Sequence, residues 1–179
     1  MSKNILVISA SLRNGSNSDM LADEFMRGAL ESGNKAEKIT LRGKNINFCK
    51  GCLACQKTGK CVINDDMAEI LTKMQQADVI CFASPVYFYD MCGQLKTFLD
   101  RTNPLFPAEY NFTDIYFLIT AADTEQTASE GPLKGLQGWI DCFENAGLKG
   151  VVCGLGAEKP GDVKSMPAMN EAYMFGKKA

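Results

Sequence analysis

The chain has 179 residues, no histidine and a formal net charge of −2 at pH 7. The near-neutral balance argues against nucleic acid as the main partner, and the lack of histidine excludes Ser-His-Asp, Cys-His and histidine–metal chemistry. No secretory signal pattern opens the chain and no apolar run approaches the roughly 18 residues of a membrane span, so we expect a cytoplasmic protein with reduced thiols.

Short apolar runs alternate with helical patterns along the chain. Strands are predicted at residues 4–9, 37–41, 78–83, 114–120 and 150–155. Helices are predicted at about 17–32, from Met67 through Met74, from Met91 to near Arg101, and over 167–177. A further helix is predicted to contain Leu136, Trp139, Ile140 and Phe143 and to end near Gly147. This alternation indicates one domain over residues 1–179, with a parallel sheet covered by helices on both faces. Ligands of such sheets bind at the carboxyl ends of the strands.

The loop between the first strand and the first helix is rich in hydroxyl groups. Backbone N–H groups and the dipole at a helix N-terminus favour a phosphate. The side chains that can donate to it are Ser11, Arg13, Ser16, Asn17 and Ser18. The loop matches neither the P-loop nor the G-x-G-x-x-G pattern. The alternative is an ordinary polar loop in which Ser16 or Asn17 only caps the helix.

The third strand is expected to stop at Ser84-Pro85, where a loop with three consecutive aromatic residues begins. Such a loop can line a flat conjugated ligand through ring packing and backbone contacts. The residues predicted to do so are Pro85, Val86, Tyr87 and Phe88. The alternative is a docking surface for another subunit. A phosphate loop beside an aromatic loop suggests a mononucleotide such as flavin mononucleotide (FMN).

A cysteine-rich loop over residues 48–62 has the spacing C-x2-C-x2-C-x5-C. Its thiols are Cys49, Cys52, Cys55 and Cys61. Such a compact run is typical of [4Fe–4S] ligation. The alternatives are a cluster-free loop, with a reversible disulfide or packed thiols, and a zinc site, although zinc usually takes two separated C-x-x-C pairs. Three lysines, Lys50, Lys57 and Lys60, either solvate this loop or guide an acidic electron carrier.

Taken together, these motifs resemble the flavodoxin-fold NADPH-dependent FMN reductase superfamily. Within it, they are most similar to the iron–sulfur flavoproteins and their cluster-free relatives. The stretches that carry the resemblance are residues 11–13 with 16–18, the cysteine run through 67, 83–87 and 94–101. The resemblance covers roughly residues 3–156 and leaves a C-terminal tail at about 157–179.

The resemblance implies an α/β three-layer sandwich of flavodoxin type, with a five-stranded parallel sheet in the order 2-1-3-4-5. It places the FMN phosphate in the loop Ser11–Ser18, the isoalloxazine against Pro85–Phe88, and the flavins near the subunit interfaces of a homodimer or homotetramer. Many relatives have a glycine-rich loop after the fourth strand that touches the flavin. Here Ala121 and Ala122 stand in that place, and we expect backbone contacts from them.

The implied function is an FMN-dependent oxidoreductase without a catalytic side chain of its own. It would move electrons from NAD(P)H, or from a reduced ferredoxin-like carrier, to a small acceptor such as a quinone or a flavin. The alternative is an iron–sulfur flavoprotein that acts as an electron-transfer module, with a [4Fe–4S] cluster in the cysteine loop. A metal-stabilised binding domain leaves the pairing of the two ligand loops unexplained. Arg101 is expected to pair with Asp100 or to dock a neighbouring subunit.

Overall fold

A computed structural model describes residues 2–179 of the chain. Five strands form a parallel sheet in the order β2-β1-β3-β5-β6. Their bounds are β1 Asn4–Ser9, β2 Lys35–Thr40, β3 Val79–Tyr87, β5 Asp114–Ala121 and β6 Gly147–Leu155. Numbered among themselves, the parallel strands run 2-1-3-4-5, which confirms the predicted order. A two-residue strand, β4 (Asp90–Met91), pairs antiparallel with β3 and was not predicted.

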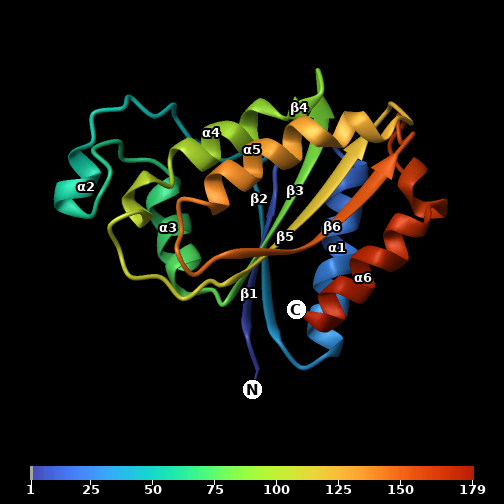
Figure 1. Cartoon of the computed structure of the whole chain (residues 1–179), viewed down its shortest axis with the longest axis horizontal. Helices are drawn as coiled ribbons and strands as arrows, with labels where there is room; N and C mark the ends of the chain where they lie inside the picture. Colours follow the sequence, from blue (N-terminus) through green and yellow to red (C-terminus); the bar gives the residue numbers. More distant parts are fainter. Residues whose placement is uncertain (1) are drawn as a thin grey trace.

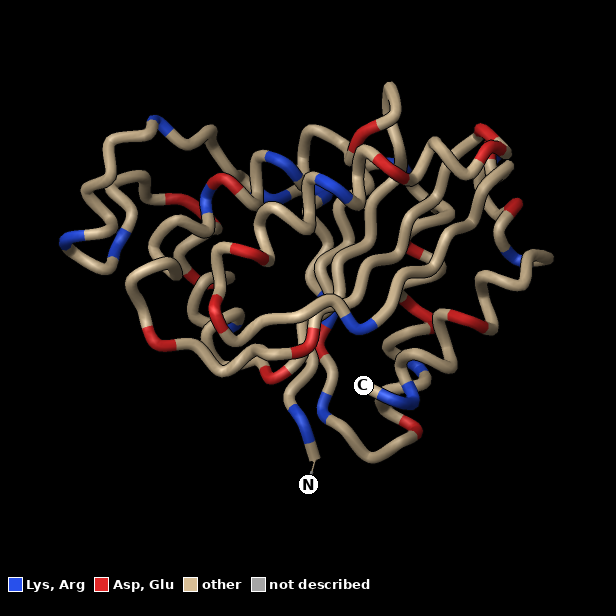
Figure 2. The backbone as a smooth tube through the Cα atoms, in the orientation of Figure 1, with Lys and Arg blue, Asp and Glu red and all other residues tan. Residues whose placement is uncertain are grey.

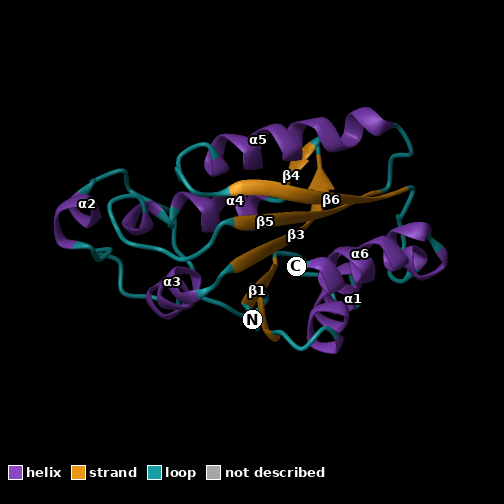
Figure 3. Ribbon diagram, turned by 60° about the horizontal axis from the view of Figure 1, so that its bottom comes forward, coloured by secondary structure: helices purple, strands orange, loops and turns teal. Residues whose placement is uncertain are grey.

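Helices cover both faces of the sheet, as the alternating pattern predicted (Figure 1). On one face lie α1 (Asn17–Glu31) and α6 (Pro167–Lys178), and on the other α3 (Met67–Gln76), α4 (Gly93–Asp100) and α5 (Glu130–Ile140). Figure 3 shows these two helical layers on either side of the strands. Shorter helical turns are α2 Ala54–Thr58, η1 Asn103–Leu105, η2 Gln126–Ser129 and η3 Asp162–Ser165.

Side chains of the central strands alternate between two apolar layers. In β1, Ile5 and Val7 pack with α1 and α6, whereas Leu6 and Ile8 pack with α3, α4 and α5. All four are almost fully buried. Because successive strand residues point to opposite faces, a continuous apolar run is what a strand covered on both sides requires.

The third strand does not stop at Ser84-Pro85, contrary to the prediction. It continues to Tyr87, with Pro85 paired to Thr120 of β5, and then turns back through β4. Proline fits extended backbone and lacks only the N–H donor, which is tolerated at the end of a ladder. The predicted aromatic loop is therefore a β-hairpin, and Met91 belongs to it rather than to the following helix.

Helix α5 ends at Ile140, whereas the sequence predicted that this helix ends near Gly147. Gly147 instead opens β6 and donates its N–H to the Thr113 carbonyl at 2.8 Å. Phe143 still packs in the core beside Trp139, although it lies beyond the helix. Pairing of Gly147 with β5 thus outweighs the apolar spacing that predicted a longer helix.

Helices α1 and α6 approach each other at two glycines, Gly28 and Gly176. A Cβ added to Gly28 would lie 2.1 Å from the Tyr173 carbonyl oxygen, and one on Gly176 would lie 1.9 Å from that of Phe25. The expected final helix is thus confirmed, and its backbone packs directly on the backbone of α1. Among residues 2–179, no helix has the length and apolar character that a membrane crossing requires.

Candidate functional site

The loop predicted to hold a phosphate joins β1 to the N-terminus of α1. Ser16 is the N-cap of α1, and its hydroxyl accepts the Asp19 N–H at 3.2 Å. The capping role that sequence left open for Ser16 is therefore present. Ser18 is fully buried in the first turn, and its hydroxyl has no hydrogen-bond partner within residues 2–179. A buried hydroxyl without a partner is costly, and a bound acceptor would satisfy it.

The side chain of Asn17 bonds to the segment that follows β6. Its amide nitrogen donates to the carbonyls of Ala157 (3.1 Å) and Lys159 (2.9 Å). Its oxygen accepts the N–H groups of Gly161 (2.9 Å) and Val163 (3.3 Å). Both amide hydrogens are thus used, and Asn17 fastens the segment after β6 to the start of α1.

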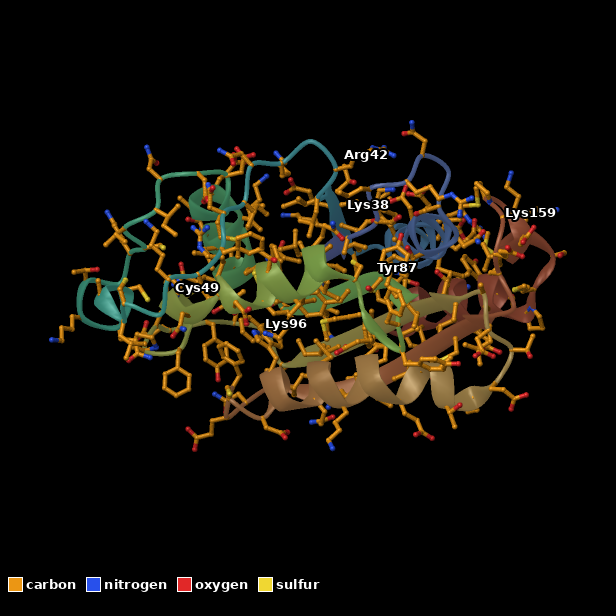
Figure 4. The ribbon with its side chains drawn as sticks, turned by 90° about the horizontal axis from the view of Figure 1, so that it is seen from above. Lys38, Arg42, Cys49, Tyr87, Lys96 and Lys159 are labelled. Atoms are coloured by element: carbon orange, nitrogen blue, oxygen red, sulfur yellow. The ribbon has the colours of Figure 1, made fainter. Side chains whose placement is uncertain are left out.

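Cationic side chains surround this loop. Arg13 is exposed, and its guanidinium donates to the Glu158 carbonyl at 3.0 Å through one nitrogen. Arg42 donates to the Asn14 side chain at 2.7 Å. Figure 4 shows Arg42 and Lys159 on two sides of α1, the helix that follows this loop. Ser11 is buried, and its hydroxyl accepts the Arg13 N–H at 3.3 Å.

The aromatic residues lie on the hairpin that β3 and β4 form at the same edge of the sheet. Val86 pairs with Met91 and Tyr87 with Asp90, so Phe88 and Tyr89 make a two-residue turn. Both have positive φ, 51° and 61°. This backbone region normally selects asparagine or glycine, and each bulky residue there costs about 1–2 kcal/mol. Strain of this kind is characteristic of binding sites and of switch segments.

Neighbouring segments hold the strained turn in place. The Tyr89 hydroxyl donates to the Asp123 carboxylate at 2.8 Å, and this bond raises the pKa of Tyr89. The Tyr89 carbonyl also lies against Gly131, where an added Cβ would be only 2.0 Å from its oxygen. Phe88, by contrast, is entirely exposed, and half of Tyr87 is exposed. The hairpin therefore presents rigidly held apolar rings at the surface.

The remaining predicted contact residues border the hairpin. Pro85 and Val86 are half-buried at its base. Ala121 is buried at the end of β5, and Ala122 is exposed just beyond it. Because β1, β3 and β5 are neighbours in the sheet, the loops that carry these residues and the loop Ser11–Ser18 emerge at one edge. The predicted cofactor residues are thus brought to one side of the molecule.

The cysteine loop projects from one end of the molecule, where Figure 1 shows α2. Figure 4 shows Cys49 and Tyr87 at opposite ends of α4. Eight helical residues span about 12 Å, so α4 separates the cysteine loop from the hairpin by about that length. Figure 2 shows only basic positions along the outer part of this loop, namely Lys50, Lys57 and Lys60.

All four predicted cysteines line one cavity, together with Arg101 and Asn103 among others. All four are free thiols. Two of the sulfurs accept backbone N–H groups, Cys49 from Gly51 and Cys61 from Ile63, each at 3.5 Å. Burial, and then the neighbouring Cys61 thiol, raise the pKa of Cys55. Among residues 2–179, however, no three potential ligands converge closely enough to hold a single metal ion.

Sequence reasoning missed an ion pair at the base of this loop. Arg101 pairs with Asp65, not with Asp100, whose carboxylate instead accepts Lys96 at 2.5 Å. Both side chains of the Arg101–Asp65 pair are buried. Burial alone would raise the pKa of Asp65, but hydrogen bonds from Arg101 and Asn47 hold it well below its ordinary range. Arg101 and Asp65 lie 36 positions apart in the sequence. The signal available in the sequence was a charged residue at the end of a predicted apolar helix, because such a residue needs a partner of opposite charge when it is buried.

Comparisons with known proteins identify relatives of the chain. A family described as NADPH-dependent FMN reductase matches residues 3–129. A Bacillus subtilis protein, provisionally named NAD(P)H-dependent FMN-containing oxidoreductase YwqN, is 30% identical over 172 residues, which cover 89% of this chain and 88% of that protein. An iron–sulfur flavoprotein of Methanocaldococcus jannaschii is 44% identical over 101 residues, or 56% of this chain and 52% of that protein. The chain thus spans about half the length of the first iron–sulfur flavoproteins that it matches.

Solved structures share the fold over the whole chain. An NAD(P)H:quinone oxidoreductase from Methanothermobacter marburgensis superposes with a TM-score of 0.72 at 19% identity, covering 100% of this chain and 94% of that one. An azoreductase from Bacillus anthracis has a TM-score of 0.74 at 14% identity and covers both chains completely. At these identities the likeness establishes the three-layer architecture alone.

Proposed function

The chain belongs to the NADPH-dependent FMN reductase family, and on this premise we propose that it is an oxidoreductase that binds FMN at the loop Ser11–Ser18 and the hairpin Pro85–Tyr89. Its donor would be NAD(P)H or a reduced carrier, and its acceptor a small molecule such as a quinone or a flavin. FMN supplies the hydride and single-electron chemistry when bound. The observation that carries the proposal is a buried hydroxyl without a partner at a helix N-terminus, beside a strained aromatic hairpin at the same sheet edge.

The phosphate loop would act through Ser18, Ser11, Arg13 and backbone N–H groups. The Ser18 hydroxyl has a donor hydrogen that no residue of 2–179 accepts. The dipole of the 15-residue α1 favours a dianion at its N-terminus. Arg13 adds a forked donor at the exposed side. Asn17 would act indirectly, because its bonds to 157–163 hold the loop in shape.

The hairpin would hold the planar ring. The rings of Tyr87 and Phe88 stand on backbone fixed by the Tyr89–Asp123 bond and by contact with Gly131. A rigid aromatic surface binds a flat ligand with little loss of conformational entropy. Beside it, Ala122 is exposed, whereas Ala121 is buried and its carbonyl accepts the Ala157 N–H at 2.8 Å. Exposed Tyr87 and Phe88 are also suited to burial against a second copy, so we expect a homodimer or homotetramer, which light scattering would measure.

A fluorescence titration with FMN tests the site. Ser18→Ala should weaken FMN binding about 10- to 150-fold, because a hydrogen bond to a charged group contributes about 1.5–3 kcal/mol. Its stability should stay near that of the wild type, since the hydroxyl has no partner to lose. Ser32→Ala, at the other end of α1, is the matched control and should bind FMN normally. Equal FMN affinity in Ser18→Ala and the wild type would contradict the proposed phosphate site.

A second candidate is an electron-transfer module with a [4Fe–4S] cluster held by Cys49, Cys52, Cys55 and Cys61. Zinc needs all its thiolates within about 2.3 Å of one centre, whereas a cluster binds each thiolate at a different iron. The four thiols line one cavity, as the ligands of one cluster must. The lysines on the loop suit an acidic ferredoxin-like partner.

Iron and sulfide analysis of anaerobically purified protein separates the two candidates. A module should contain iron and acid-labile sulfide and should oxidise NAD(P)H slowly with quinone as the acceptor. An oxidoreductase should turn over NAD(P)H and quinone whether or not iron is present. Protein that neither binds FMN nor holds iron would refute both.

A further inference from the structure

Arg101 joins the two ends of the cysteine loop. It directly follows α4, and its side chain is 1% exposed. Its two terminal nitrogens bind the Asp65 carboxylate at 2.7 and 2.9 Å. One of them also donates to the Asn47 carbonyl at 2.7 Å. Since Asn47 precedes the loop and Asp65 follows it, this guanidinium holds both ends of the segment that carries the four cysteines.

The third donor of this guanidinium has no acceptor. Arg101 Nε is buried and has no hydrogen-bond partner among residues 2–179. Arg101 and all four thiols line the same cavity. Leaving an N–H of a buried cation unsatisfied is unfavourable, and Asp65 already uses the other two nitrogens. The buried Nε–H group therefore lacks an acceptor within residues 2–179, although the guanidinium lines the cavity of the four cysteines.

A cluster ligated by thiolates would supply that acceptor. Its sulfurs are hydrogen-bond acceptors, and hydrogen bonds to them and net charge nearby set its reduction potential. Two backbone N–H groups already point to Cys49 and Cys61. A hydrogen bond donated to a sulfur favours the reduced cluster, because reduction adds one electron and one negative charge, whereas Asp65 balances the charge of Arg101.

We propose that Arg101 donates its Nε–H to a sulfur of an iron–sulfur cluster near Cys61, and that this hydrogen bond raises the reduction potential of the cluster. This proposal rests on the second candidate above, the cluster held by the four cysteines. The Asp65 carboxylate holds the two terminal nitrogens, so that Nε is the donor left for the cluster. Arg101 would thus tune how readily the loop accepts an electron, in addition to holding the loop together.

The test uses the full chain reconstituted anaerobically with ferrous iron and sulfide. Redox titration with dithionite, followed by absorbance, gives the midpoint potential. Arg101→Gln should shift the one-electron equilibrium at least tenfold toward the oxidised form, or about 59 mV. Arg101→Lys keeps the charge but loses Nε, and should fall between Arg101→Gln and the wild type. The matched control is Lys57→Gln, which removes an exposed cation from the same loop and should shift the equilibrium less than twofold.

A second measurement needs no variant, in case both Arg101 variants fail to fold or to hold iron. In the reduced wild-type protein labelled with 15N-arginine, pulsed electron paramagnetic resonance should detect 15N coupled to the cluster. Arg13, Arg27 and Arg42 lie outside the cysteine pocket, so the signal would come from Arg101. A wild-type potential in Arg101→Gln, or no 15N coupling, would overturn the proposal while the cluster stands. Wild-type protein that takes up no iron and sulfide would overturn the cluster and this proposal together, and FMN binding would be unaffected.

Discussion

The packing of α6 on α1 gives a prediction in which the effect on stability has opposite signs at two glycines. Gly28 and Gly138 both lie inside helices, α1 and α5. By helix propensity alone, alanine at either position would stabilise the helix by about 1 kcal/mol. At Gly138 nothing lies within 4 Å of an added Cβ, so that gain should be realised.

At Gly28 the same Cβ would lie 2.1 Å from the Tyr173 carbonyl oxygen and 3.1 Å from its carbon. These are backbone atoms, and no change of rotamer can relieve the clash. Overpacking costs about 1–3 kcal/mol where side chains can adjust, and a helix that must move as a body should cost at least the upper value. After the propensity gain of about 1 kcal/mol is subtracted, we expect Gly28→Ala to lower the free energy of unfolding by at least about 2 kcal/mol, while Gly138→Ala raises it by up to about 1 kcal/mol.

Urea unfolding followed by circular dichroism measures both variants against the wild type. Similar m-values would show that the same surface unfolds, so that midpoints can be compared directly. Hydrogen exchange should show the loss in α6 first, because its contact with α1 is what the substitution disturbs. A Gly28→Ala protein as stable as the wild type would refute the direct backbone packing of α6 on α1.

Three further predictions concern the ligand loops and the ion pair. Phe88→Asn should stabilise the fold by about 1 kcal/mol, because asparagine tolerates positive φ, and calorimetry measures this gain. The same substitution should weaken FMN binding in a titration. Unchanged FMN affinity would count against the hairpin as the site of the flavin ring. Asn17→Ala removes four hydrogen bonds and should cost about 2 kcal/mol or more; hydrogen exchange at residues 157–163 should rise, and unchanged protection would contradict the assigned fastening role. Asp65→Asn should cost about 3–5 kcal/mol at neutral pH, because it leaves Arg101 buried without its counter-charge. The pKa of Asp65 in the folded protein lies below its ordinary 3.8, so the stability that the ion pair contributes is complete above about pH 4 and is lost as the pH falls through the folded pKa. A difference in stability between the wild type and the variant that stays constant in acid would refute this reasoning.

Local sequence determined the architecture of this chain. The apolar side chains of the β-branched run at 4–9 can all be buried only between two helical layers, and β1 forms there. Leu21, Phe25 and Ala29 recur at four-residue steps, and α1 buries all three. Hydroxyl groups placed between that strand and that helix indicated the phosphate loop, because both flanking elements are defined by short-range patterns.

Tertiary structure decided what depends on partners far along the chain. Pro85 stays in strand because Thr120 of β5 lies beside it, and Gly147 opens β6 because β5 needs a neighbour there. Arg101 meets Asp65 only after the cysteine loop has folded back on the end of α4. No local rule reports such pairings, because their energy comes from burial and from contacts between residues that the sequence keeps apart. Periodicity and composition therefore predict the elements and a candidate ligand edge, while long-range packing decides which polar groups there lack a partner within residues 2–179.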